Sequence, residues 1–246
     1  MNSTKLLQEP NMSEEKILAK ATGALESLTK LEDFTTFHGG DDLTYLVAIS
    51  FTTGQRSKSM VEKSIDNIAD LHPEKLFEKM WKQVFPMENI FQESAMVAFG
   101  NLFNILQFFW NATDKSVKIG TCLVKSDMLK HLVKSLRDPR LKEIVSEDQK
   151  NIKDQKAKNE QSLKSDFLCA IFCIIHNMLF LEVPDAYQEL RSLDAVEALV
   201  FYLDAPLSNV KFQALDALAG LVDEKENDLI NATDENIKMF VKEVDK

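Results

Sequence analysis

The chain has 246 residues, 45% of them hydrophobic, and can therefore bury a large core in one domain or in two smaller ones. Its 7 glycines and 6 prolines are too few for an all-β protein, because short strands need many turn residues between them. The net charge of −10 repels nucleic acids and anionic membranes, so we expect neither as a partner, and a basic or neutral protein is favoured.

Residues 1–12 are predicted to form a flexible tail, and they lack the apolar run of roughly 7–15 residues that a secretory signal needs. The most hydrophobic stretch, residues 167–181, is shorter than the roughly 20 residues that cross a bilayer and is predicted to be a buried core helix. The three cysteines, Cys122, Cys169 and Cys173, are an odd number, as expected for free thiols in a reducing compartment. We therefore expect a cytoplasmic protein, with the nucleus as the alternative.

A five-residue pattern recurs along the chain and predicts helical repeats. It consists of a small or apolar residue, an apolar residue, any residue, a polar or small residue and an apolar residue. Its copies begin at Ala24, Ser64, Ala98, Ile174 and Ala217, so successive copies start 40, 34, 76 and 43 residues apart. Each copy lies in a stretch whose apolar residues are spaced by three and four, as on one face of a helix. A period of this size is typical of stacked helical units, each of which covers the apolar face of its neighbour.

A second helix recurs upstream of two of these copies, at residues 126–136 and 193–203. Pro139 and Pro206 follow these segments and are predicted to stand in the first turn of the next helix, where a missing N–H costs little. The order helix, tight turn, helix, helix in residues 194–222 resembles the armadillo repeat, a unit of roughly 40 residues. HEAT-like repeats are the alternative.

The resemblance extends in weaker form over residues 13–246. It implies an all-α fold, a right-handed armadillo-like superhelical solenoid of about five helical repeats. The long spacing of 76 residues is explained by a charged insertion at about residues 140–165, which holds 7 Lys and Arg against 5 Asp and Glu. We interpret this insertion as a solvated loop or a projecting charged helix, with a docking segment as the alternative.

Three of the recurring helices carry an asparagine at the same position: Asn67, Asn101 and Asn177. In armadillo proteins the matching asparagine of the third helix faces the concave groove and bonds the backbone of an extended peptide, and the resemblance implies the same role here. Asn104 and Trp110 are expected to flank this surface. The alternative is that each asparagine bonds the backbone of a neighbouring repeat, because a buried amide without a partner costs about 1–3 kcal/mol.

The armadillo proteins that read nuclear-import signals place a tryptophan four residues before this asparagine, whereas this chain has Lys63, Val97 and Cys173 there. An import receptor is therefore not expected. The predicted function is a scaffold that holds a protein or an extended peptide on the concave face. The alternatives are a substrate-recruiting subunit of a ubiquitin ligase, a regulatory module of a signalling enzyme and, from another class, an all-helical hydrolase.

Two groups of chemically reactive residues are interpreted as structural. Cys169, Cys173 and His176 would share one face of a helix, but their neighbours are apolar and a zinc site needs a fourth ligand, so a core role is favoured. A Cys–His nucleophile would require Cys122 and a histidine to meet in space, and no spacing indicates such a pair. The histidines considered are His38, His72 and His131. The sequence has no phosphate-binding loop, and we predict no enzyme activity, cofactor or metal.

Overall fold

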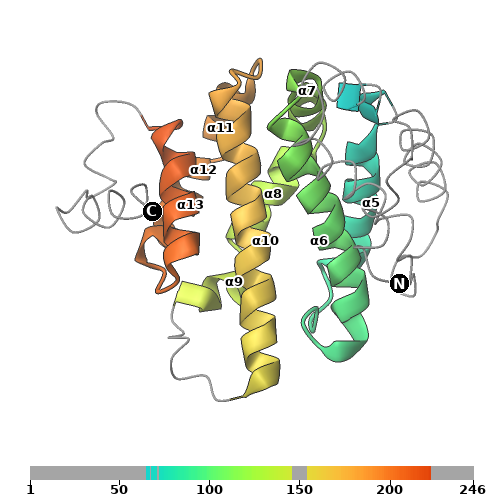
Figure 1. Ribbon diagram of the computed structural model, residues 1–246, viewed down its shortest axis with the longest axis vertical. Helices are drawn as coiled ribbons and strands as arrows, with labels where there is room; N and C mark the ends of the chain where they lie inside the picture. Colours follow the sequence, from blue (N-terminus) through green and yellow to red (C-terminus); the bar gives the residue numbers. More distant parts are fainter. Residues whose placement is uncertain (1–64, 67, 71, 146–153, 223–246) are drawn as a thin grey trace, which may run out of the picture. The chain divides into compact units, whose positions relative to one another are not determined.

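The protein is all-helical wherever its structure is described. The computed structural model describes residues 65–66, 68–70, 72–145 and 154–222 (Figure 1). These ranges contain α-helices and short 3₁₀ helices and no strand, which confirms the all-α prediction. The first copy of the recurring pattern, part of the second, including Asn67, and the predicted tail lie outside the described residues.

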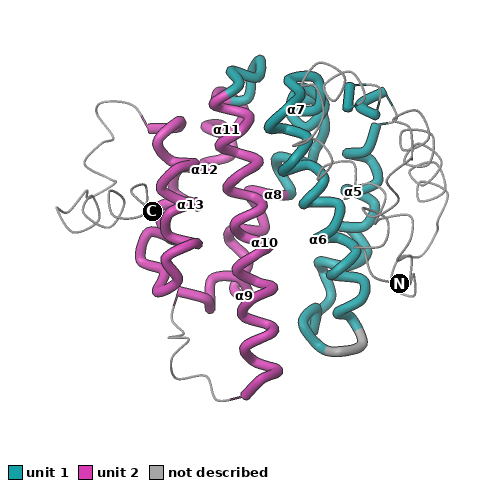
Figure 2. Tube along the Cα trace, viewed as in Figure 1, with its two compact units in different colours: residues 1–131, 181–186 teal, residues 132–180, 187–246 magenta. Residues whose placement is uncertain are grey.

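The chain divides into two compact units, which Figure 2 shows in different colours. Unit 1 contains the described residues up to His131 together with Leu181–Ala186. Unit 2 contains the described residues of Leu132–Phe180 and those from Tyr187 onward. The boundary after His131 falls inside one continuous helix, α8 (Met128–Leu136).

The described helices of unit 1 before α8 are α5 (Pro73–Val84), α6 (Glu93–Thr113) and α7 (Val117–Lys125). α5 packs against α6, and α6 packs against α7. Pro73 stands in the first turn of α5, where a proline has no helical hydrogen bond to lose. Ser116 caps α7, because its Oγ accepts a hydrogen bond from the backbone N–H of Ile119 at 3.2 Å.

Aromatic rings form much of the core of unit 1. Phe77 and Trp81 on α5 stack with their centroids 5.8 Å apart, and Phe77 meets Phe109 on α6 edge to face at 6.3 Å. Trp81 also stacks on Phe85 at 3.8 Å. Each fully buried ring stabilises the fold by about 1.5–3 kcal/mol. This core holds one side of α6 against α5 and so determines which side of α6 remains accessible.

The described helices of unit 2 follow the last turns of α8. They are α9 (Pro139–Lys142), η2 (Glu143–Val145), α10 (Gln155–Phe180), α11 (Ala186–Ser192), α12 (Ala195–Val200), η4 (Phe201–Asp204) and α13 (Ser208–Ala219). The first residue of α11, Ala186, belongs to unit 1. α10 and α13 pack side by side (Figure 1). The two predicted upstream segments correspond to α8 and to α12 with η4, and the later copies of the pattern lie in α6, in α10 and at the end of α13.

The two prolines that were expected to start helices behave differently. Pro139 is the first residue of α9, as predicted. The prediction for Pro206 is wrong, because α13 begins two residues later at Ser208 and has Leu207 as its N-cap. The residue before Pro206, Ala205, has φ −60° and ψ 135°, the extended conformation that a following proline favours. The chain therefore needs an extended link before α13 begins.

Helix α10 joins part of the predicted insertion to the predicted core helix. Residues 167–175 and Met178 are buried, which confirms the core helix over this part of the predicted range 167–181, whereas Phe180 is exposed and α10 ends there. α10 is long and apolar enough to cross a bilayer, but 61% of its most apolar window is buried inside the protein, as in the core helix of a globular domain. The residues of the insertion from Gln155 onward are helical, so a helix describes this part better than a loop. Residues 146–153 lie outside the described residues.

Candidate partner-binding faces

Between Ala95 and Thr113, one side of α6 is accessible and carries no charged residue. From Ala95 to Thr113, Val97 is exposed and seven further positions are half-buried. Five of the eight, spaced by three and four, form one stripe in which amides predominate: Val97, Gly100, Asn104, Gln107 and Asn111. The other three, spaced by seven, form an apolar stripe beside it: Met96, Phe103 and Trp110. We call these eight residues the α6 face. None of them is charged, although charged residues make up 28% of the chain.

The predicted site residues on α6 do not all share this face. Asn104 and Trp110 belong to it and are half-buried. Asn101 is only 8% exposed and lies about 180° around the helix from Trp110. Its burial agrees with the alternative that the amide is bonded within the protein, because buried amides need partners.

The remaining predicted residue that the structure describes, Asn177, lies in unit 2 near the end of α10 and is half-buried. Three residues further on, Phe180 is 75% exposed. The Phe180 ring stacks on the imidazole of His176, with centroids 5.8 Å apart and planes inclined by 15°. His176 Nδ1 in turn lies 3.2 Å from Asp216 Oδ2 on α13. The exposed ring of Phe180 therefore packs on the imidazole of His176, which is itself paired with the carboxylate of Asp216.

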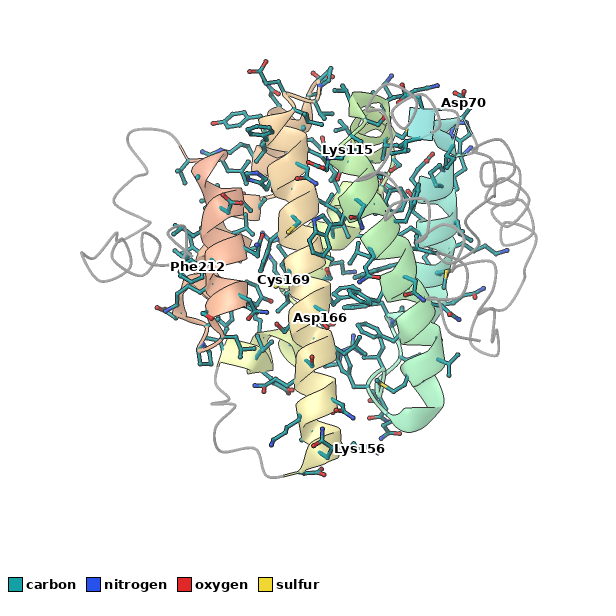
Figure 3. All side chains as sticks on the ribbon, viewed as in Figure 1. Asp70, Lys115, Lys156, Asp166, Cys169 and Phe212 are labelled. Atoms are coloured by element: carbon teal, nitrogen blue, oxygen red, sulfur yellow. The ribbon has the colours of Figure 1, made fainter. Side chains whose placement is uncertain are left out.

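The stripe of Cys169, Cys173 and His176 on α10 faces polar groups on α13. Figure 3 labels Cys169 on α10 and Phe212 on the neighbouring α13. Cys173 Sγ donates to Oε1 of Gln213 at 2.9 Å. Asn209 Nδ2 donates to Oγ of Ser165 at 2.9 Å and lies 3.7 Å from Cys169 Sγ. These pairs link α10 to α13, and both cysteines are buried, which confirms the predicted core role for them. In the described part of the chain, no three His, Cys, Asp or Glu side chains are grouped to hold a metal ion.

Burial raises the pKa of the Cys169 thiol to about 11 and that of the Cys173 thiol to about 12. Unfolded thiols ionise near their ordinary pKa of 9, so the unfolded chain loses these protons first as the pH rises. The free energy of unfolding is therefore expected to fall between pH 9 and pH 11, by up to about 1.4 kcal/mol per pH unit for each thiol.

Urea unfolding at pH 8, 9, 10 and 11 measures this pH dependence. The Cys169→Ala/Cys173→Ala double variant serves as the comparison, because it lacks both titrating groups. Its stability is expected to decline less steeply above pH 9 than that of the natural protein. Parallel curves for the two proteins would show that the thiols do not titrate as their burial requires.

The thiol that was considered as a nucleophile, Cys122, is not arranged as an activated one. Its Sγ lies 3.9 Å from the carbonyl oxygen of Ala69, and burial, followed by the negative charge of Glu74, raises its pKa. Because the thiolate is the attacking species, a raised pKa lowers its reactivity. His72 Nδ1 instead pairs with Glu74 Oε1 at 3.0 Å, and the His131 ring stacks on Trp81 at 5.8 Å. His38 lies outside the described residues.

Sequence reasoning missed seven residues of these surfaces: Phe180 and six residues of the α6 face, which are Met96, Val97, Gly100, Phe103, Gln107 and Asn111. The six on α6 had a signal in the sequence, because the helical positions between the buried ones hold no charged residue from Ala95 to Thr113. Phe180 had none, because it ends an apolar run that reads as core. Comparison with known proteins adds no assignment: no family model matches this sequence, and no curated protein is significantly similar to it.

Proposed function

We propose that this chain is an interaction protein that binds another protein, or an extended segment of one, on the α6 face. The observation that carries the proposal is that, from Ala95 to Thr113, all eight accessible positions of α6 are uncharged. The side of a helix that faces solvent normally carries charged and polar residues, whereas the side that faces the core is apolar. A half-buried face made of amides and apolar side chains has instead the composition of a binding surface.

The chemistry of the two stripes fits a polypeptide ligand. Trp110, Phe103 and Met96 are of the residue types enriched at protein interfaces, where large rings supply most of the binding energy. Asn104 and Gln107 each offer both donors and an acceptor, as needed to bond the N–H and C=O groups of a peptide backbone. The resemblance to armadillo repeats, whose asparagines bond extended peptides, points to the same kind of ligand.

Unit 2 offers a second contact region around Asn177. Phe180 is an exposed ring that stacks on His176. An anchor that is already ordered loses little conformational entropy when it binds, which favours its use in recognition. Asn177 and Phe180 are three positions apart on α10 and therefore share one side of the helix.

Affinity capture from the native cells tests the proposal with the Asn104→Lys variant. A lysine in the middle of the α6 face would be desolvated without a partner by any bound chain, so the captured partner is expected to fall by about tenfold or more. Gln188→Lys is the matched control, because Gln188 is an exposed amide on α11 and receives the same change of charge.

Circular dichroism must show that both variants melt as the natural protein does. Loss of a partner with Asn104→Lys and its retention with Gln188→Lys would support the proposal. A folded Asn104→Lys protein that retains every partner would contradict it. The identity of the captured protein would also separate ubiquitin-ligase recruitment from regulation of a signalling enzyme.

A further inference from the structure

The chain has one strongly basic segment, although its net charge is −10. Residues 115–142 hold eight Lys and Arg against two Asp, and this segment includes α7, α8 and α9. The rest of the chain is correspondingly more acidic than the total suggests. An anionic ligand is therefore repelled by most of the protein and attracted to this segment.

Exposed positive charges of this segment lie on α7, at Lys118 and Lys125, and along α8 and the residue that follows it. Lys130, Lys134 and Arg137 are all exposed and follow one another at spacings of four and three. Lys130 and Lys134 are one turn apart on α8 and therefore share one side of it, and Arg137 is the first residue after the helix ends at Leu136. We call these three residues the α8 basic stripe. The described ion pairs of the basic segment involve Lys115, Lys118 and Arg140, and neither lysine of the stripe is in one.

Arg137 is already held in place by the fold of unit 2. Its Nη2 donates to the carbonyl oxygens of Leu193 at 3.1 Å and of Asp194 at 2.9 Å. A guanidinium has five N–H donors, so these two bonds orient the group while its other nitrogens remain able to donate. A cation that is held in advance loses less entropy when it binds a carboxylate.

We infer that the α8 basic stripe binds an acidic segment of another protein. The complementary charge is the reason for choosing an acidic partner, because three cations at α8 and its end are exposed and none of them is paired with a carboxylate among the described residues. The inference is independent of the α6 face, which is uncharged and lies on a different helix.

Two other anionic partners fit the stripe less well. A membrane surface is usually bound by a helix that also inserts apolar side chains, but those of α8 are buried in the core: Met128, Leu129, Leu132, Val133 and Leu136. A single-stranded nucleic acid is usually bound by aromatic rings that stack on its bases, and α8 contains no aromatic residue other than the half-buried His131.

Fluorescence anisotropy with a fluorescein-labelled peptide of ten glutamates tests the inference on the purified full chain. The Lys130→Glu/Lys134→Glu variant is expected to weaken binding of this peptide by about tenfold or more, which corresponds to 1.4 kcal/mol. The matched control is Lys156→Glu/Lys158→Glu, which alters two exposed lysines on α10 and changes the net charge equally. Both variants change the net charge equally, so any general electrostatic effect on binding is the same for both. Beyond that shared effect, the control is expected to change affinity by less than about twofold.

Three results would overturn the inference. The first is no binding of the glutamate peptide by the natural chain at 50 mM salt. The second is an equal loss of binding in both double variants, which would reflect net charge alone. The third is that the natural chain binds phosphatidylserine vesicles and not the peptide, and that only the α8 variant loses this vesicle binding. That result would identify a lipid surface as the partner. The Asn104→Lys variant is expected to bind the peptide as the natural chain does, so failure of this inference and failure of the proposed function are distinguishable.

Discussion

Replacing Tyr202 by alanine is expected to lower the free energy of unfolding by about 3–5 kcal/mol. The side chain is fully buried in unit 2, where its ring meets Phe172 edge to face at 5.4 Å. Its hydroxyl donates to the carbonyl oxygen of Leu136, at the end of α8, at 2.7 Å. Alanine would remove both interactions and leave a cavity that the neighbouring helices fill only in part. Urea denaturation followed by circular dichroism measures the loss.

The Tyr202→Phe variant separates the hydrogen bond from the packing. It keeps the ring and removes only the hydroxyl, so its cost is expected to be about 0.5–1.5 kcal/mol. A cost of Tyr202→Ala no larger than that of Tyr202→Phe would show that the ring is not packed as described. A stable Tyr202→Ala protein would contradict the placement of η4 against α8.

Replacing Gly120 by alanine is expected to destabilise the protein by about 1–3 kcal/mol, although alanine is the better helix former. A Cβ at position 120 would lie 2.6 Å from Cγ2 of Val183, which is closer than carbon atoms approach in folded proteins. Both residues are buried in unit 1, so the collision cannot be relieved by turning a side chain towards solvent. Thermal and urea unfolding measure the effect.

Gly100→Ala is the matched control for this prediction. Gly100 is also inside a helix of unit 1, but a Cβ there would meet no atom within 4 Å. Gly100→Ala is therefore expected to stabilise the protein by about 0.5–1 kcal/mol through helix propensity alone. Adding Val183→Ala to Gly120→Ala should remove the collision, so the two changes together should cost less than their separate costs combined. Additive costs would show that Val183 does not pack on Gly120.

Helix positions could be predicted from the sequence because apolar spacing directly encodes them. The copies that begin at Ala98 and Ile174 lie within α6 and α10, and Pro139 begins α9 as expected. Pro206 was placed wrongly because the pattern does not show how many extended residues a link between helices requires. The helical part of the insertion was not distinguished from a loop, because exposed charged helices and solvated loops have similar compositions.

The candidate site could be predicted only in part, and the reason is rotation around the helix axis. A helix turns by about 100° per residue, so Asn104 reaches the accessible side of α6 while Asn101, three positions earlier, lies at its buried edge. The exposure of Phe180 depends on where α10 ends. The next residue but one, Glu182, has a positive φ of 51°, and the chain leaves the helix there. Neither the rotation nor the helix end is visible in a repeat pattern.

Site-specific photo-crosslinking is the most direct test of binding on the α6 face. Full-length protein carrying p-benzoylphenylalanine at position 107, within the face, would be irradiated in native cells beside protein carrying it at position 188 on α11. We expect a covalent adduct with a specific partner from position 107 and none of that partner from position 188. A folded protein that gives no adduct from position 107, or the same adducts from both positions, would contradict a binding role for this face.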